Sequence, residues 1–177
     1  MGRTAIIMAG GKGTRMHDPE KCLIRIGKLS LIANLSEILS YSGFEIVIAT
    51  TGLHRKVTQF AEENGIDIVY TSGSGYETDI GEAVASLAEF PMLVVPGDLM
   101  TADKSLFQEV WETGTRSGAG VVTFRLNGNF SGISVINRLP LIGTPMDFET
   151  VDIMSGGSFN VNTPADLELA RSYFLTP

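Results

Sequence analysis

The chain has 177 residues, a formal net charge of −7, a hydrophobic content of 44% and one cysteine, Cys22. This composition predicts a single globular domain over residues 1–177. The negative charge argues against nucleic acid as a partner, because binding to a phosphate backbone needs a basic face. No apolar run approaches the roughly 18 residues of a membrane span, and a lone cysteine favours a reducing, cytoplasmic location.

Apolar, β-branched runs alternate with amphipathic stretches along most of the chain. The expected strands are Thr4–Ala9, Glu45–Thr50, Asp67–Tyr70, Met92–Val95 and Ala119–Phe124. Apolar residues at helical spacing predict helices around residues 31–39, 57–61, 80–87 and 106–111. This alternation is typical of an α/β fold with a mostly parallel sheet that is covered on both faces.

The last third of the chain has a different pattern. Asn127-Gly128 lies between two apolar runs, which is a strong signal for a β-hairpin. An antiparallel pair should therefore join the parallel sheet. Further on, Thr163 followed by Pro164 and Asp166 is typical of the start of a final helix.

The segment Gly10–Arg15 directly follows the first expected strand and contains three glycines. Glycines let the backbone turn and let a ligand approach main-chain amides, while Lys12 and Arg15 add positive charge. A cradle for a triphosphate fits this composition, although a tight turn with solvated cations explains the glycines alone equally well. The spacing matches neither a Walker loop nor a dinucleotide fingerprint, which would need a third glycine where Met16 stands.

Ligands of open α/β sheets bind outside the carboxyl ends of the strands. Four loops should leave those ends, at Gly10–Lys21, Thr50–His54, Thr71–Tyr76 and Pro96–Thr101. We expect these loops to meet in one crevice. The histidines His17 and His54 have no partners at metal-ligand spacing, and surface or loop positions are the simpler interpretation of both.

Several loop residues have both a functional and a structural interpretation. Asp98 could hold Mg²⁺ together with phosphate oxygens, or it could be a turn residue. Asn162 could add an amide oxygen to that metal, or it could only cap the last helix. Ser72 and Gly73 could lie against a purine ring or belong to a flexible loop. Asp79 could stabilise a helix N-terminus, or it could contact the ribose or the acceptor.

The strings "MAGGKGTRM" and "EKCLI" resemble the signature of the nucleotidyltransferases that activate sugars and cofactors. His17 and Cys22 depart from it, because they stand where a glycine and a proline are usual. The strings "YTSGSGYETDI", "MLVVPGDLM", "SGISVI" and "FNVNTPADLELA" extend the resemblance, over Ala5 to Leu175, to the archaeal GTP:adenosylcobinamide-phosphate guanylyltransferases.

This resemblance implies a Rossmann-like, three-layer α/β/α nucleotidyltransferase fold. It also implies transfer of GMP from GTP to adenosylcobinamide phosphate, with release of pyrophosphate, as a step of cobalamin biosynthesis. The preference for guanine depends on the resemblance alone. Two alternatives remain open: the same chemistry with another acceptor, such as molybdopterin or a sugar phosphate, and a module that binds GTP without turnover. A homodimer is compatible with either.

The loop pattern and the resemblance together predict the site residues. The expected catalytic residues are Lys12, Arg15, Lys21 and Asp98, with Mg²⁺ held by Asp98 and Asn162. The expected nucleotide contacts are Ala9, Gly10, Gly11, Lys12, Gly13, Thr14, Arg15, Lys21, Thr50, Ser72 and Gly73. Gly97 and Gly132 are expected to leave room for the acceptor, a phosphorylated corrinoid.

Overall fold

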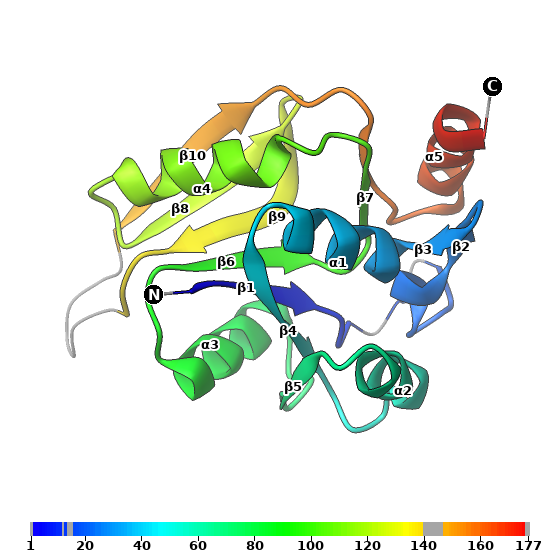
Figure 1. Cartoon of the computed structure of the whole chain (residues 1–177), viewed down its shortest axis with the longest axis horizontal. Coiled ribbons are helices and arrows are strands. Elements are labelled where there is room, and N and C mark those ends of the chain that lie inside the picture. The colour runs from blue at the N-terminus through cyan, green and yellow to red at the C-terminus, as the bar shows by residue number, and fades with distance from the viewer. Residues whose placement is uncertain (1, 12, 14–15, 140–146, 176–177) are drawn as a thin grey trace.

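The computed structural model describes residues 2–11, 13, 16–139 and 147–175, which Figure 1 shows as a ribbon. In this part of the chain, a seven-stranded sheet has the order β10-β8-β9-β6-β1-β4-β5. Its strands are β1 (Arg3–Met8), β4 (Phe44–Thr50), β5 (Asp67–Tyr70), β6 (Met92–Pro96), β8 (Val121–Leu126), β9 (Asn129–Ile136) and β10 (Phe148–Ile153). Two short antiparallel ribbons pair β2 (Arg25–Ile26) with β3 (Leu29–Ser30), and β7 (Leu99–Thr101) with β11 (Ser158–Asn160). The α-helices are α1 (Leu31–Tyr41), α2 (Arg55–Glu63), α3 (Tyr76–Leu87), α4 (Leu106–Arg116) and α5 (Pro164–Leu175).

The sheet is mixed, as expected, and among its described strands only β9 runs opposite to the others. β1 pairs in parallel with β4 and β6, and β10 pairs in parallel with β8. β9 runs antiparallel to both β6 and β8. The predicted hairpin is confirmed: Asn127 and Gly128 both have positive φ, 52° and 80°, as a tight two-residue turn between strands requires.

Two apolar clusters cover the two faces of the sheet, which confirms the three-layer arrangement. Successive residues of a strand point to opposite faces. Ile7 accordingly packs in the cluster that includes side chains of α1, α2 and α4, while its neighbour Ile6 packs with Val84 of α3. These side chains have almost no exposed surface. Burial of this kind stabilises the fold by roughly 25 cal/mol per Å² of apolar surface.

A third apolar cluster attaches the end of the chain to the ribbons. Leu167 of α5 packs there with Met100 of β7 and Val161. The predicted helix start is confirmed, because the Thr163 hydroxyl accepts the Asp166 amide at 3.2 Å and the Asp166 carboxylate accepts the Thr163 amide at 2.8 Å. As a result of this packing, the segment after β11 lies next to the carboxyl end of β6.

Candidate active site

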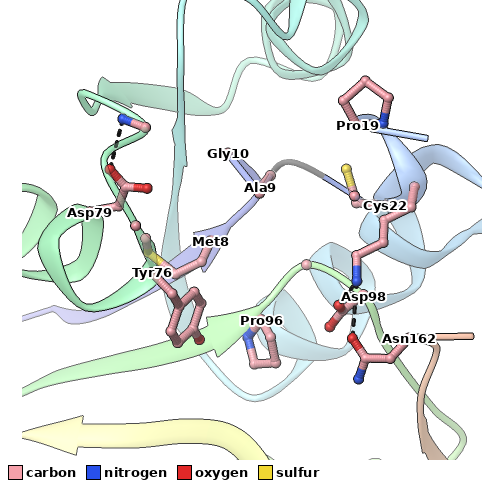
Figure 2. Close-up of a pocket in the computed structure, with 16 residues that line it drawn as sticks. Met8, Ala9, Gly10, Pro19, Cys22, Tyr76, Asp79, Pro96, Asp98 and Asn162 are labelled. Carbon is pink, nitrogen blue, oxygen red and sulfur yellow. Dashed lines mark hydrogen bonds and ion pairs between the residues drawn. The ribbon is translucent and has the colours of Figure 1, made fainter. Parts of the chain in front are cut away.

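A pocket of about 400 Å³ opens at the carboxyl ends of β1, β5 and β6 (Figure 2). Its lining residues are Met8, Ala9, Gly10, Gly11, Gly13, Pro19, Lys21, Cys22, Gly73, Gly75, Tyr76, Asp79, Pro96, Gly97, Asp98 and Asn162. Three of the four expected loops therefore line one crevice, together with the segment after β11. The fourth loop, Thr50–His54, does not line the pocket but contacts the glycine loop through His54.

Most of the predicted site residues that the structure describes come together here. Ala9, Gly10, Gly11, Gly13, Lys21, Gly73, Gly97, Asp98 and Asn162 line the pocket. Thr50, Ser72 and Gly132 are not among its lining residues. The predictions for Lys12, Thr14 and Arg15 lie outside the described residues.

The glycine loop folds back on its own backbone. The Gly13 carbonyl accepts the amides of Met16 at 3.1 Å and Asp18 at 3.2 Å. Gly13 has a φ of 58°, and a Cβ atom there would lie 1.7 Å from the Asp18 oxygen, so that only glycine fits. Gly11 differs, because a Cβ atom on it would meet no atom within 4 Å. His17 also has a positive φ, 52°, a conformation that glycine adopts more readily than other residues.

His54 ties the fourth loop to the glycine loop: the predicted loop position is confirmed, but a surface position is wrong. Its side chain is buried and lies between two polar groups. Nε2 is 3.2 Å from the Gly11 carbonyl oxygen, which can only accept, so Nε2 carries the proton. Nδ1 then accepts the Thr51 hydroxyl at 2.7 Å. The signal in the sequence that could have revealed this role is the position of His54 shortly after the carboxyl end of β4.

Thr50 has a structural position next to this contact. Its side chain is fully buried, and its hydroxyl donates to the Ala9 carbonyl at 3.3 Å. Its own carbonyl accepts the Thr71 amide at 2.8 Å. Thr50 therefore joins the ends of β1, β4 and β5 and presents no free group to the pocket.

Lys21, Asp98 and Asn162 form a polar cluster at one side of the pocket. The Lys21 ammonium makes an ion pair with the Asp98 carboxylate and donates to Asn162 Oδ1 at 3.0 Å. Figure 2 shows the side chains of Asp98 and Asn162 directed toward the same point. Asp98 lies in the turn between β6 and β7, where its carbonyl accepts the Val161 amide at 2.8 Å.

The same cluster fits a hard divalent cation. A carboxylate and a carboxamide oxygen already converge on one positive charge, and Mg²⁺ prefers such oxygen ligands together with phosphate oxygens and water. Among the residues that the structure describes, no group of three or more His, Cys, Asp or Glu side chains could hold a metal. A cation on Asp98 and Asn162 would therefore need further ligands from a bound phosphate.

Two acidic side chains of α3 hold the serine- and glycine-rich loop on the other side of the pocket. The buried Asp79 carboxylate accepts the Gly73 amide at 2.8 Å, a role that neither sequence interpretation included. Ser72 is exposed and donates to Glu82 through its amide at 2.7 Å and its hydroxyl at 2.8 Å. These bonds lower the pKa of Glu82, and they turn Ser72 away from the pocket.

The two glycines expected at the acceptor side are both constrained by packing. The Gly97 amide donates to the Met8 carbonyl at 2.9 Å, and a Cβ atom on Gly97 would lie 2.9 Å from that oxygen. Gly132 has a φ of 78°, and its carbonyl accepts the Tyr76 hydroxyl at 3.1 Å. Burial of the hydroxyl and the nearby Asp98 raise the pKa of Tyr76. Tyr76 therefore donates this bond throughout the neutral pH range.

Cys22 lies in the pocket wall as a buried, protonated thiol. Burial, followed by the charge of Asp98, raises its pKa from 9.0 to about 12. The reactive form of cysteine is the thiolate, of which only about 10⁻⁵ is present at pH 7 for such a pKa. Cys22 is therefore a packing residue and does not act as a nucleophile.

Comparison with known proteins identifies relatives of the whole fold. A family model described as the MobA-like NTP transferase domain matches residues 5–151. Adenosylcobinamide-phosphate guanylyltransferase from Methanocaldococcus jannaschii is 34% identical over 112 residues, which are 60% of this chain and 57% of that protein. This alignment thus spans less than two thirds of the relative's length.

Solved structures have the same fold at low sequence identity. HddC from Yersinia pseudotuberculosis, complexed with GMP-PN, has a TM-score of 0.77 at 14% identity, with 98% of this chain and 100% of that chain covered. A CMP:2-keto-3-deoxy-manno-octonic acid synthetase complexed with CTP has a TM-score of 0.75 at 16% identity, with 99% of both chains covered. No helix within the described ranges is both long and apolar enough to cross a membrane.

Proposed function

Because the chain belongs to the family of MobA-like NTP transferase domains, we propose that it transfers GMP from GTP to adenosylcobinamide phosphate and releases pyrophosphate. The observation that carries the chemistry is the Lys21 ammonium between Asp98 and Asn162, beside a glycine-lined pocket. The 34% identical guanylyltransferase supports both the guanine nucleotide and the corrinoid acceptor.

In the proposed reaction, a phosphate oxygen of the acceptor attacks the α-phosphorus of GTP and pyrophosphate leaves from the opposite side. Such a transfer depends on positioning and on neutralisation of charge. The amides of the loop that contains Gly10, Gly11 and Gly13 hold the β- and γ-phosphates, with Lys12 and Arg15 adding positive charge. Lys21 leaves its partners and neutralises the α-phosphate.

Mg²⁺, held by Asp98 and Asn162, would supply further neutralisation of charge between the two reacting phosphates. These two side chains would hold the ion together because their backbone segments are joined, the Val161 amide donating to the Asp98 carbonyl at 2.8 Å. When nucleotide and cation are present, the Lys21 ammonium no longer needs to balance Asp98. It is then free to contact phosphate.

The proposed acceptor is already an anionic nucleophile, so no general base is required. The described lining residues agree with this, because none of them is a histidine and Cys22 is held as a thiol. The carboxylate of Asp79 is occupied by the Gly73 amide.

The test is an assay of pyrophosphate release from GTP, with cobinamide phosphate, molybdopterin or a sugar 1-phosphate as the acceptor. We expect release with cobinamide phosphate and a product whose mass equals that of the acceptor plus that of GMP minus one molecule of water. Release with another acceptor alone would reassign the substrate but keep the chemistry. Binding of GTP without release in any mixture would favour the module that only binds nucleotide.

The nucleotide preference and the assembly state have separate tests. Thermal denaturation with each of the four NTPs ranks their affinities, because selective binding stabilises the folded state by RT ln(1 + [L]/Kd). We expect the largest shift with GTP. Light scattering during gel filtration tests whether the protein is a homodimer.

A further inference from the structure

A second pocket of about 370 Å³ lies next to the first and shares Asn162 with it. It is formed by the turn end of the β8–β9 hairpin, by β11 and by α5, all of which belong to the final third of the chain. Asn162 therefore stands between the polar cluster of Lys21 and Asp98 and this second pocket. A ligand with its phosphate at the cluster can extend directly into it.

The floor of the second pocket is rich in carboxamides. Asn129, Asn160 and Asn162 all contribute to its lining. The Asn160 amide nitrogen donates to the Ser131 carbonyl at 3.0 Å, but its Oδ1 atom is buried and has no hydrogen-bond partner. A buried polar atom without a partner costs free energy, so a ligand that reaches this oxygen after a small rotation of the Asn160 side chain and donates a hydrogen bond to it would be stabilised.

The second pocket offers no positive charge. Among the described residues that line it, Asp166 is the only charged one. Its carboxylate is already engaged as an acceptor of the Asn162 amide at 3.0 Å and the Thr163 amide at 2.8 Å. A phosphate would find no cation here, so the part of a ligand that binds in this pocket should carry no phosphate or other anionic group.

The rim of the pocket is apolar and exposed. Phe130, at the start of β9, has 71% of its surface exposed, and Leu169, on α5, has 61% exposed. Neither side chain contributes to a core cluster. An exposed aromatic and an exposed aliphatic side chain above a carboxamide floor suit a flat ring whose edge carries primary amides.

We propose that this second pocket binds the carboxamide-bearing ring of the acceptor, while the acceptor phosphate lies at Lys21 and Asp98. The proposal rests on the proposed function, because the corrin ring is the acceptor part that has many carboxamides and no phosphate. Ring amides donate to Asn160 Oδ1 and pair with Asn129 and Asn162. Phe130 and Leu169 contact the ring faces. No bond is made or broken in this pocket.

The test uses dicyanocobinamide, which has the ring and its carboxamides but no phosphate, in equilibrium dialysis with the full chain. We expect wild-type protein to bind it, and Phe130→Ser and Leu169→Glu each to weaken binding at least about tenfold. Both residues are exposed, so the fold should tolerate the changes, which thermal denaturation verifies. GTP affinity should stay within about twofold of wild type.

Matched controls come from the same sheet and from the same helix. Phe148, on β10, is 68% exposed, and Leu175, on α5, is 55% exposed, yet neither lines the second pocket. Phe148→Ser and Leu175→Glu should therefore bind dicyanocobinamide as wild type does. Absence of binding to wild type, or equal binding by rim and control variants, would overturn the proposal.

Guanylyl transfer to cobinamide phosphate then separates this proposal from the proposed function. Rim variants should raise the acceptor KM at least about tenfold and leave kcat at saturating acceptor unchanged. If the ring binds at the rim but no transfer occurs, the pocket assignment stands and the guanylyltransferase function fails. If transfer occurs with the same KM in rim variants and wild type, the function stands and the pocket assignment fails.

Discussion

The Nζ atom of Lys21 donates a hydrogen bond to Oδ1 of Asn162 over 3.0 Å, although 141 positions separate the two residues in the sequence. The same ammonium makes an ion pair with Asp98. One positive charge therefore organises two oxygen ligands before any nucleotide is present. A divalent cation that binds these oxygens must compete with Lys21 for them.

Lys21→Met should separate the two roles of this lysine. Removal of the ammonium frees Asp98 and Asn162, so Mn²⁺ should bind the nucleotide-free protein at least about tenfold more tightly, about 1.4 kcal/mol. Electron paramagnetic resonance of Mn²⁺ measures this affinity directly. Turnover should nevertheless fall, because the α-phosphate loses its counter-charge. Equal Mn²⁺ affinity in variant and wild type would show that Lys21 and the cation use different sites.

Asp98→Asn should lose most turnover and retain much of the GTP affinity, because the glycine loop contacts the phosphates independently. Steady-state kinetics with saturating Mg²⁺ and calorimetric titration with GTP measure the two quantities. A turnover within about threefold of wild type corresponds to less than about 1 kcal/mol in the barrier. That result would make Asp98 a turn residue only.

Gly11→Val should abolish GTP binding while the fold stays intact. A Cβ atom on Gly11 meets no atom within 4 Å, so the added side chain has space in the protein but blocks the approach of phosphate. Gly13→Val is the contrasting variant, because its Cβ atom would lie 1.7 Å from the Asp18 oxygen and the loop must rearrange. Circular dichroism and GTP titration distinguish them. Wild-type GTP affinity in Gly11→Val would contradict the phosphate cradle.

His54→Phe should raise the GTP Kd about tenfold, since the Gly11 carbonyl loses the donor Nε2 and the Thr51 hydroxyl loses the acceptor Nδ1. Loss of these bonds should also lower the free energy of unfolding by about 1–2 kcal/mol. His54→Gln places an amide nitrogen near the position of Nε2 and should recover part of the GTP affinity. If both variants bind GTP as wild type does, His54 only supports the fold.

Cys22 should make the protein less stable at high pH. Its pKa rises from 9.0 to about 12 on folding, so the folded thiol stays protonated while the unfolded one loses its proton. The unfolded state is favoured increasingly as the pH rises from 9 to 12. Urea denaturation at pH 8 and at pH 10.5 should show a larger loss of stability for wild type than for Cys22→Ala. The native thiol should also resist thiol reagents at pH 8, and rapid labelling would contradict its burial.

The sequence predicted the elements that carry a strong apolar pattern. The strands β1, β4, β5, β6 and β8 and all five predicted helices are present, because the strands form apolar, β-branched runs and the buried faces of the helices repeat at the helix period. β10 was not predicted, since most of its residues are exposed and Phe148 is 68% exposed. The ribbons of β2, β3, β7 and β11 have only two or three residues each, too few to show a period.

Residues of the site were predictable where position along a strand determines them. Asp98 and Gly11 directly follow strands whose carboxyl ends meet at one edge of the sheet. The contact of Lys21 with Asn162 and the contact of His54 with Gly11 were not predictable, because packing between distant segments creates both. The second pocket was not predictable for the same reason, because packing between the β8–β9 hairpin, β11 and α5 forms it.

The main-chain bond from the Val161 amide to the Asp98 carbonyl has a consequence for synthesis of the chain. A growing polypeptide leaves the ribosome N-terminus first, so the glycine loop and the turn after β6 emerge well before residues 158–162. Until that segment docks onto β7, Lys21 has Asp98 as its partner but lacks Asn162. A nascent chain that has released only β1 to β9 therefore cannot assemble the complete cluster of Lys21, Asp98 and Asn162.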